Sequence, residues 1–344
     1  MNRREFLAMP LVLAGTGFLP RLTDAGTAEP IRLAHLGAHE GRFTTGALTL
    51  VSGYSEEGHH FAGQAVAELI SRHVSGAKAL LTVVATPADA LRLLQAGRTD
   101  TPYGQFTVDL ALVDGDELSA LRGVDASRLQ DLGELRLLAV LPAQVLHIVT
   151  LHGSPIASVG ELKGKTVSLG PAGSRSEKIM LRLLEAFDLP IGSSIQREAL
   201  PLAASMKALA ERKIDGFAWH GPTSPALFEH LAGLLGIRMT LLSHEEGIVK
   251  VRAKYGPAYY TARIKKTAYS WLEKDVRALG TANLLISRAD LSAQRAYDIV
   301  KTLSAHPHAL EGEGLGSSDP GAGPEAAILL PLHPGALRFR EETK

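Results

Sequence analysis

The sequence has 344 residues, no cysteine, and 36 basic residues against 36 acidic ones, which gives a formal net charge of zero. The absence of cysteine excludes disulfides, thiolate metal sites and thiol nucleophiles, and the balanced charge argues against a nucleic-acid-binding surface. With 45% hydrophobic and 21% charged residues the chain has the composition of a globular protein, and its length exceeds one domain of about 100–150 residues, so we expect two lobes.

The first 28 residues have the features of an export signal. Arg3 and Arg4 resemble a twin-arginine motif, and Ala8–Leu19 is an apolar segment of signal-peptide length, shorter than the about 20 residues that span a bilayer. Small residues up to Ala28 predict cleavage after that position. The mature protein is therefore expected in the periplasm, exported by the twin-arginine pathway.

From Ala47 onwards, short apolar strands alternate with helical patterns, which is typical of βα units around mainly parallel sheets. The first set comprises strands at 47–52, 79–85 and 109–113, and helices at 60–72 and 87–96. Extended segments at 135–141 and 147–151 are expected to carry a crossover to the next set.

A second set of βα units follows. It comprises strands at 166–169, 194–199, 215–219 and 238–242, and helices at 175–187, 201–212 and 225–235. The stretch 255–271 is expected to be irregular, and a strand at 281–287 and a helix at 292–305 come after it. The glycine-rich segment 312–324 is expected to be a surface loop.

Two similar βα sets predict an α/β protein with two lobes and a ligand-binding cleft between them. We expect lobe 1 to contain residues 29–145 and 245–344, and lobe 2 to contain residues 146–244. Open α/β sheets bind ligands beyond the carboxyl ends of their strands. The candidate site is therefore formed by the loops after four strand ends: Ser52, Val113, Leu169 and Trp219.

The glycine-rich turn before the helix at 175–187 has two interpretations. Gly170 and Gly173 let the backbone approach closely, and a helix N-terminus attracts anions, so the turn could hold a phosphate or a carboxylate. Alternatively, Ser174 and Glu177 form a capping box that satisfies two of the free N–H groups. Both interpretations remain open from the sequence.

Arg175 is the main candidate for charge recognition at this turn. Its guanidinium can bind a carboxylate through two parallel hydrogen bonds beside the helix N-terminus. Without an anion, an arginine in the first helical turn would be unfavourable against the helix dipole. The hydroxyl groups of Ser174 and Ser176 are further donors, with capping as their alternative role.

Other candidates stand at strand ends. Tyr54 could stack on a ligand or pack within its loop, and Trp219 could form a wall of the site or part of the core. His220 follows Trp219 at the end of the same strand. Asp114 and Gln144 end strands of lobe 1, where Asp114 could instead cap a following helix.

Two acidic residues and two histidines precede the first helix: Glu56, Glu57, His59 and His60. Adjacent histidines point in different directions at a helix start, and no third ligand follows at helical spacing, so we predict no metal site. His59 remains a candidate for a hydrogen bond to the ligand. No motif in the chain predicts a cofactor.

Four segments resemble the TAXI branch of solute-binding proteins, the receptors of tripartite ATP-independent periplasmic (TRAP) transporters. Leu162–Gly170 is similar to the family's strand entry, and Pro171–Glu177 to its Gly-Ser-Gly-Thr-Glu turn. Lys213–Pro222 resembles the second-lobe motif, and Leu332–Phe339 the C-terminal His-Pro-Gly-Ala ending. The resemblance covers nearly all of the mature chain, from Leu48 to Arg340.

This resemblance implies a venus-flytrap receptor of type II-like fold, with two mainly parallel sheets flanked by helices. Such a receptor is a monomer that binds a dicarboxylate or a glutamate-like amino acid without catalysis and delivers it to a TRAP membrane permease. Some departures concern the ligand: Arg175 stands where the family has glycine, Gln144 where it often has glutamate, and Trp219-His220 where smaller residues are usual. The loop Gly53–His60 is also more charged than the family's.

Two other functions remain compatible with this sequence. A sensor domain that presents its ligand state to a membrane kinase would share the cleft and the export signal. An enzyme built on Ser174, His220 and Asp114 is the other alternative, although the sequence contains no nucleophile elbow, P-loop or zinc motif.

Overall fold

The computed structural model describes residues 47–53, 58–84, 87–101, 104–118, 133–223, 225–310, 315–316 and 330–343. These residues all belong to one compact unit, 32–344. The predicted export signal, Tyr54 and most of the predicted loop 312–324 lie outside the described residues. Among the helices that are described, none has the length and apolar character needed to cross a membrane.

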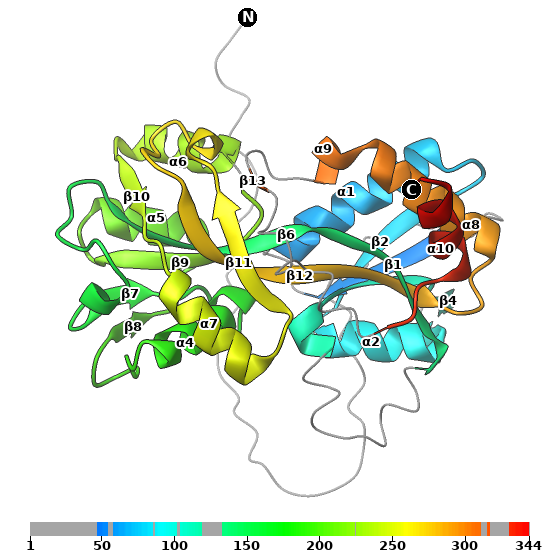
Figure 1. The fold of residues 1–344 in the computed structure, drawn as a ribbon, viewed down its shortest axis with the longest axis horizontal. Coiled ribbons are helices and arrows are strands. Elements are labelled where there is room, and N and C mark those ends of the chain that lie inside the picture. Colours follow the sequence, from blue (N-terminus) through cyan, green and yellow to red (C-terminus); the bar gives the residue numbers. More distant parts are fainter. Residues whose placement is uncertain are drawn as a thin grey trace, which may run out of the picture. The chain divides into compact units, whose positions relative to one another are not determined.

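In this part of the chain, a mixed sheet of 11 strands has the order β2-β1-β5-β12-β6-β9-β7-β8, with β10 paired to β6 and β11 paired to β12 and β13. A separate hairpin consists of β3 (Arg98–Thr101) and β4 (Gly104–Thr107). The strands of the large sheet (Figure 1) are β1 (Ala47–Gly53), β2 (Lys78–Val84), β5 (Leu110–Asp114), β6 (Leu135–Leu151), β7 (Thr166–Ser168), β8 (Gln196–Glu198), β9 (Gly216–Gly221), β10 (Met239–Leu241), β11 (Tyr259–Ile264), β12 (Val276–Arg288) and β13 (Leu315–Gly316).

The sheet contains the two predicted sets of parallel strands. In the first set β1 pairs in parallel with β2 and β5, and in the second β7 pairs in parallel with β8 and β9. The long strands β6 and β12 pair antiparallel with each other. Strand β12 also pairs antiparallel with β5 of the first set, and β6 pairs antiparallel with β9 of the second. The predicted α/β class is confirmed. The sequence analysis predicted two sheets, but β6 and β12 join the two sets of strands into a single sheet.

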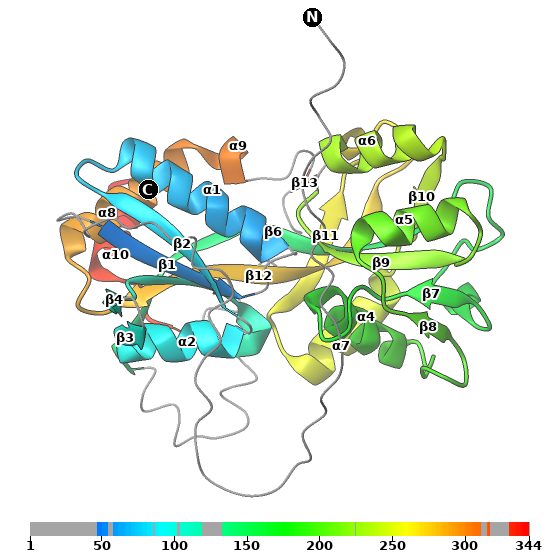
Figure 2. The same cartoon turned by 180° about the vertical axis from the view of Figure 1, so that it is seen from behind.

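Helices cover both faces of the first set. Leu110 and Leu112 of β5 pack with α1 and α8, whereas Ala111 and Val113 pack with α2. Because successive strand residues point to opposite faces, α1 and α2 lie on opposite sides of the sheet (Figures 1 and 2). The helices are α1 (Gly58–His73), α2 (Pro87–Ala96), α4 (Arg175–Ala186), α5 (Leu202–Ala210), α6 (Pro225–Leu235), α7 (Glu245–Tyr255), α8 (Ala293–Ala305), α9 (Pro307–Leu310) and α10 (Pro334–Glu342).

The second set has the same layering. Phe217 and Trp219 of β9 pack with α5 and α6, and the intervening Ala218 packs with α4 on the other face. This arrangement positions the N-terminus of α4 beside the carboxyl end of β9, where the backbone N–H of His220 donates to Ser176 Oγ at 2.8 Å. The candidate site is built at this junction.

The expectation of an irregular stretch at 255–271 was wrong. Strand β11 occupies 259–264 and pairs with the first half of β12, which begins at Val276 and not at Thr281. Both Tyr259 and Tyr260 are buried, because the strand is covered on both faces. Its sequence therefore lacks the alternation that marks a half-buried strand.

The two extended segments predicted at 135–141 and 147–151 form one continuous strand, β6. Pro142 is accommodated at a bulge, because Gln144 pairs with Thr281 while Leu141 pairs with Asn283, which leaves two residues of β6 opposite one of β12. The predicted boundary between residues 145 and 146 falls inside this strand, and the division into lobes stays a prediction.

The C-terminal His-Pro-Gly-Ala segment joins α10 to α8. His333 Nδ1 accepts a hydrogen bond from the Gly335 N–H at 3.2 Å, and its Nε2 donates to the Leu291 carbonyl at 2.9 Å. A Cβ atom on Gly335 would lie 2.1 Å from the carbonyl oxygen of Ala293, so only glycine permits this helix contact. The motif has a structural role in this chain.

Candidate functional site

The turn before α4 is shaped by glycine and closed by a cap. Gly170 has a φ of +96°, and a Cβ there would lie 2.7 Å from Ser176 Cβ. Ser174 is the N-cap, and its Oγ accepts a hydrogen bond from the Glu177 N–H at 3.2 Å. The Glu177 carboxylate accepts from the Gly173 N–H at 2.7 Å, one residue before the cap. The predicted capping role of Ser174 is confirmed.

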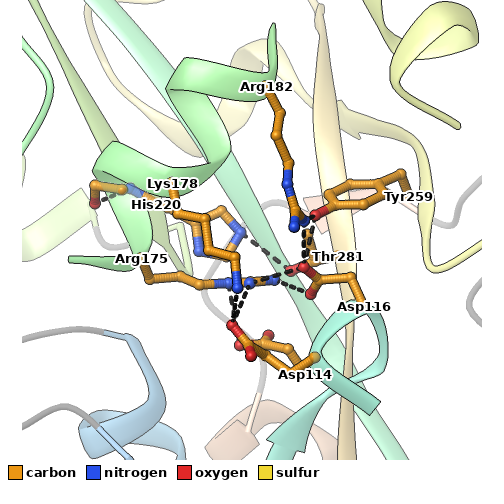
Figure 3. A network of polar contacts seen from close by, with 10 residues as sticks. Asp114, Asp116, Arg175, Lys178, Arg182, His220, Tyr259 and Thr281 are labelled. Carbon is orange, nitrogen blue, oxygen red and sulfur yellow. Dashed lines mark hydrogen bonds and ion pairs between the residues drawn. The ribbon is translucent and has the colours of Figure 1, made fainter. Parts of the chain in front are cut away.

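Two oppositely charged groups face each other next to this turn (Figure 3). One face of α4 carries three cations at spacings i, i+3 and i+7, which we call the basic stripe: Arg175, Lys178 and Arg182. The end of β5 and the helical turn at 115–118 carry three carboxylates, which we call the acidic turn: Asp114, Asp116 and Glu117.

Arg175 is held by two carboxylates of the acidic turn. Its Nη1 donates to Asp116 Oδ2 at 3.0 Å, its Nη2 pairs with Asp116 Oδ1, and its Nε lies 3.1 Å from Asp114 Oδ2. The Arg175 side chain is 2% exposed. Burial alone would lower the pKa of the guanidinium, but Asp114 and Asp116 raise that pKa above its ordinary value, so the arginine is charged.

Asp116 is the centre of the network. Its Oδ2 also accepts from Arg182 Nη1 at 2.6 Å and from the Tyr259 hydroxyl at 2.6 Å. Burial would raise the pKa of Asp116, but Arg175, together with the hydrogen bond from Tyr259 and the charge of Arg182, holds it well below the ordinary value. Lys178 pairs with Glu117, so every member of the basic stripe has a carboxylate partner.

A row of polar side chains continues from the acidic turn across the sheet. Asp114 stands opposite Asn283, Gln144 opposite Thr281, and Thr281 Oγ1 lies 3.1 Å from His220 Nε2. Directly opposed residues share a face of the sheet, and so do Thr281 and Asn283 at spacing two, so these five side chains form one polar row.

Two amide groups of the polar row have unused hydrogen-bonding capacity. Gln144 is 3% exposed and Asn283 is 1% exposed. Gln144 Nε2 and Asn283 Oδ1 are buried without a hydrogen-bond partner. A buried polar atom in this condition is costly, so its presence in a folded protein calls for an explanation.

The structure brings together many of the candidates that the sequence indicated: Asp114, Gln144, Ser174, Arg175, Ser176 and His220. Gly173 lies in the exposed turn before α4, with a φ of +78°. Trp219 points to the opposite face from His220 and packs in the core, with its ring centroid 5.2 Å from that of Phe228. Of the two interpretations of Trp219, a wall of the site or a core residue, the structure supports the core residue.

The side chains of two further candidates, Tyr54 and His59, are not described by the structure. Tyr54 lies outside the described residues, and His59 falls in the first turn of α1, where its side chain is not described. Within the described ranges, no group of three His, Asp or Glu side chains is arranged to hold a metal ion.

The sequence interpretation missed seven residues of this site: Asp116, Glu117, Lys178, Arg182, Tyr259, Thr281 and Asn283. The basic spacing on α4 was visible in the sequence and could have indicated an acidic partner. The contact between Asp116 and Tyr259 joins residues 143 positions apart, which no local pattern indicates.

The model of the NMT1-like family matches residues 55–343, which is most of the chain. The chain belongs to the NMT1-like family. This family and the two sets of parallel βα units agree with the predicted periplasmic-binding-protein class. The narrower resemblance to the TAXI branch stays a prediction.

Solved structures similar to this NMT1-like protein include three binding proteins. The aliphatic sulphonate binding protein SsuA from Escherichia coli is 17% identical, with 77% of this chain and 76% of that chain covered and a TM-score of 0.42. A TctC solute binding protein from Polaromonas is 13% identical, with 87% and 98% covered and a TM-score of 0.46. A TRAP periplasmic solute binding protein from Chromohalobacter salexigens is 12% identical, with 78% and 77% covered and a TM-score of 0.41.

Proposed function

We propose that this NMT1-like protein is an exported solute-binding receptor. It captures a small organic acid or amino acid at the basic stripe and the polar row and delivers it to a TRAP-type permease. The observation that supports this most is Arg175, a buried guanidinium at the N-terminus of α4, beside the carboxyl ends of β5 and β9. Ligands of open α/β sheets bind at such strand ends, and helix N-termini favour anions.

The present contacts of Arg175 indicate how a ligand carboxylate would bind. Asp116 presents two oxygens to the guanidinium, Oδ2 to Nη1 at 3.0 Å and Oδ1 to Nη2. A ligand carboxylate has the same planar pair of oxygens and can take the same two hydrogen bonds. Binding at Arg175 then requires the acidic turn to release the basic stripe.

The contacts of the serine and histidine candidates favour binding over catalysis. Ser174 Oγ accepts a hydrogen bond as the helix cap, and the His220 ring faces the Thr281 hydroxyl. A nucleophilic serine needs a base within hydrogen-bond reach, and these contacts assign both side chains to other partners. A receptor without turnover is the function we propose.

Isolation of the native protein from the periplasm, followed by mass spectrometry of the bound small molecules, tests the proposal. We expect a small carboxylate-containing solute to co-purify and to bind again, saturably, to the stripped protein in calorimetry. Incubation with that solute should leave its concentration unchanged. Consumption of the solute would contradict a receptor role, and absence of any small-molecule binding would remove the proposal.

Export is tested in the same cells. We expect replacement of Arg3 and Arg4 by lysine to keep the protein in the cytoplasm with residues 1–28 attached, because a twin-arginine signal depends on both arginines. Fractionation and mass measurement show the outcome. Undiminished export of the variant would assign the leader to another pathway.

A further inference from the structure

We infer that the solute is a zwitterionic amino acid of zero net charge, with an uncharged side chain that hydrogen-bonds to Gln144 and Asn283. This inference rests on the proposed function and narrows it, since it separates neutral amino acids from dicarboxylates and from acidic amino acids. It follows from the charge balance of the site and from the two unpaired amides.

The charges of the described site are balanced before any ligand binds. The basic stripe carries three positive charges and the acidic turn three negative charges, and the ion pairs connect every member. Arg175, Asp114 and Asp116 are each at most 2% exposed in their side chains. A net charge added to such a site is not screened by water and is therefore strongly disfavoured.

A zwitterion can enter this site without upsetting the balance. Its carboxylate replaces Asp116 on the Arg175 guanidinium, and its ammonium group then neutralises the displaced carboxylate of the acidic turn. A dicarboxylate can make the first exchange but brings no cation for the second. It would leave two uncompensated negative charges beside Asp114 and Asp116, which disfavours it.

The polar row provides the contacts for the rest of the solute. Asn283 stands opposite Asp114, so it adjoins the carboxylates that would receive the ammonium group. Gln144 Nε2 offers a hydrogen-bond donor and Asn283 Oδ1 an acceptor, both buried and without partners. A carboxamide side chain carries one acceptor and two donors and complements both groups. An ionised carboxylate has no donor for Asn283 Oδ1.

A binding panel with matched shapes tests the charge requirement. Glutamine and glutamate differ by one charge at nearly equal size, and asparagine and succinate extend the comparison. In calorimetry with the stripped mature protein, we expect glutamine or asparagine to bind at least about 100-fold more tightly than glutamate or succinate, since a lost buried charge balance outweighs one hydrogen bond.

Two substitutions test the amides. We expect Gln144→Met and Asn283→Leu each to weaken binding of the neutral amino acid by about tenfold or more, because each removes one hydrogen bond to the solute. Neither should lower the midpoint of urea unfolding, because each removes a buried polar atom that has no partner in the protein. A purely structural role would instead move the midpoint and leave affinity unchanged.

Ser287→Ala is the matched control. Ser287 is a buried β12 residue whose Oγ also lacks a partner, and it lies four residues from Asn283, about 13 Å along the strand. Its substitution should leave the affinity for the solute unchanged and should not lower the midpoint of urea unfolding. Equal loss of affinity in the control and in the amide variants would overturn the assignment of Gln144 and Asn283.

The outcomes separate this inference from the proposed function. If an acidic amino acid or a dicarboxylate binds more tightly than the neutral amino acids, the receptor function stands and the inference is overturned. If the native protein yields no bound solute and the panel shows no binding, both are overturned. A neutral amino acid that co-purifies and requires both amides supports both.

Discussion

At the scale of single residues, the main feature is a buried arginine whose partners come from the same chain. Arg175 touches Asp114 and Asp116, and Asp116 also receives Arg182 and Tyr259. The network joins α4 to the end of β5 and to β11 through charged groups. We therefore expect its members to affect both folding and binding of the proposed solute.

We expect Arg175→Ala to lower the free energy of unfolding by about 3–5 kcal/mol, because Asp114 and Asp116 would stay buried without their guanidinium. The same change should weaken binding of a carboxylate-containing solute by about tenfold or more. Urea unfolding and calorimetry measure the two effects.

Arg263→Ala is the control for this prediction. It removes an exposed pair with Asp275 and should lower the free energy of unfolding by less than about 1 kcal/mol. Similar stabilities of the two variants would contradict the buried pairing.

Two buried histidines should make the protein sensitive to acid. Burial lowers the pKa of His147 and of His244 to about 4, below the ordinary value of 6.5. In the unfolded chain these histidines take up a proton near pH 6.5, whereas in the folded chain they stay neutral until about pH 4. The free energy of unfolding should therefore be highest above pH 6.5 and decrease as the pH falls towards 4. Each histidine contributes up to about 3 kcal/mol to this decrease.

The slope of unfolding free energy against pH between 6.5 and 4 measures this effect. His244 accepts from the Leu279 N–H at 2.7 Å and contacts the Leu242 carbonyl at 3.1 Å. Asparagine can keep both kinds of hydrogen bond without titrating, so His244→Asn should reduce the slope. A slope that stays the same in this variant would show that His244 does not titrate in the unfolding equilibrium.

At the scale of elements, the sequence predicted the βα units because their caps and apolar periods are local. Helix α2 occupies the predicted range 87–96, and helix α4 begins where its capping residue indicated, with Ser174 as the observed N-cap. Strand β11 and the start of β12 escaped prediction because both are covered on two faces and are stabilised by each other. The site shows the same division: strand ends indicated Asp114 and Arg175, whereas cross-strand register brought in Asn283.

Helix contact in the C-terminal motif yields a further prediction. Gly335→Ala should destabilise the protein by about 1–3 kcal/mol, because the new Cβ would lie 2.1 Å from the Ala293 carbonyl oxygen. Gly233→Ala is the matched control in helix α6, where a Cβ would meet nothing within 4 Å, and it should stabilise by about 0.5–1 kcal/mol. Thermal unfolding of both variants tests this prediction. A Gly335→Ala variant with unchanged stability would show that α8 and α10 can move apart without cost.

At the scale of the whole molecule, β6 and β12 belong to both sets of βα units. Strand β12 pairs with β5 of the first set and, through β6, is connected to β9 of the second. Neither set can keep its sheet if these strands unfold. The described fold should therefore behave as one cooperative unit.

We expect a single thermal transition whose calorimetric enthalpy equals the van't Hoff enthalpy, for the chain that begins at residue 29. Differential scanning calorimetry at two scan rates tests this expectation. Two resolved transitions would show that the predicted lobes fold independently despite the shared strands.

The bulge at Pro142 has a consequence for how this site can change. Two residues of β6 stand there against one of β12, so every later position of β6, beginning with Gln144, takes its side from that extra residue. Deleting Ala143 would leave Pro142 alone opposite Ala282 and keep Gln144 opposite Thr281, whereas closing the bulge without a deletion would bring Ala143 opposite Thr281 and turn Gln144 to the other face. A change that closes this bulge could thus alter the solute preference with no substitution among the residues proposed to meet the solute.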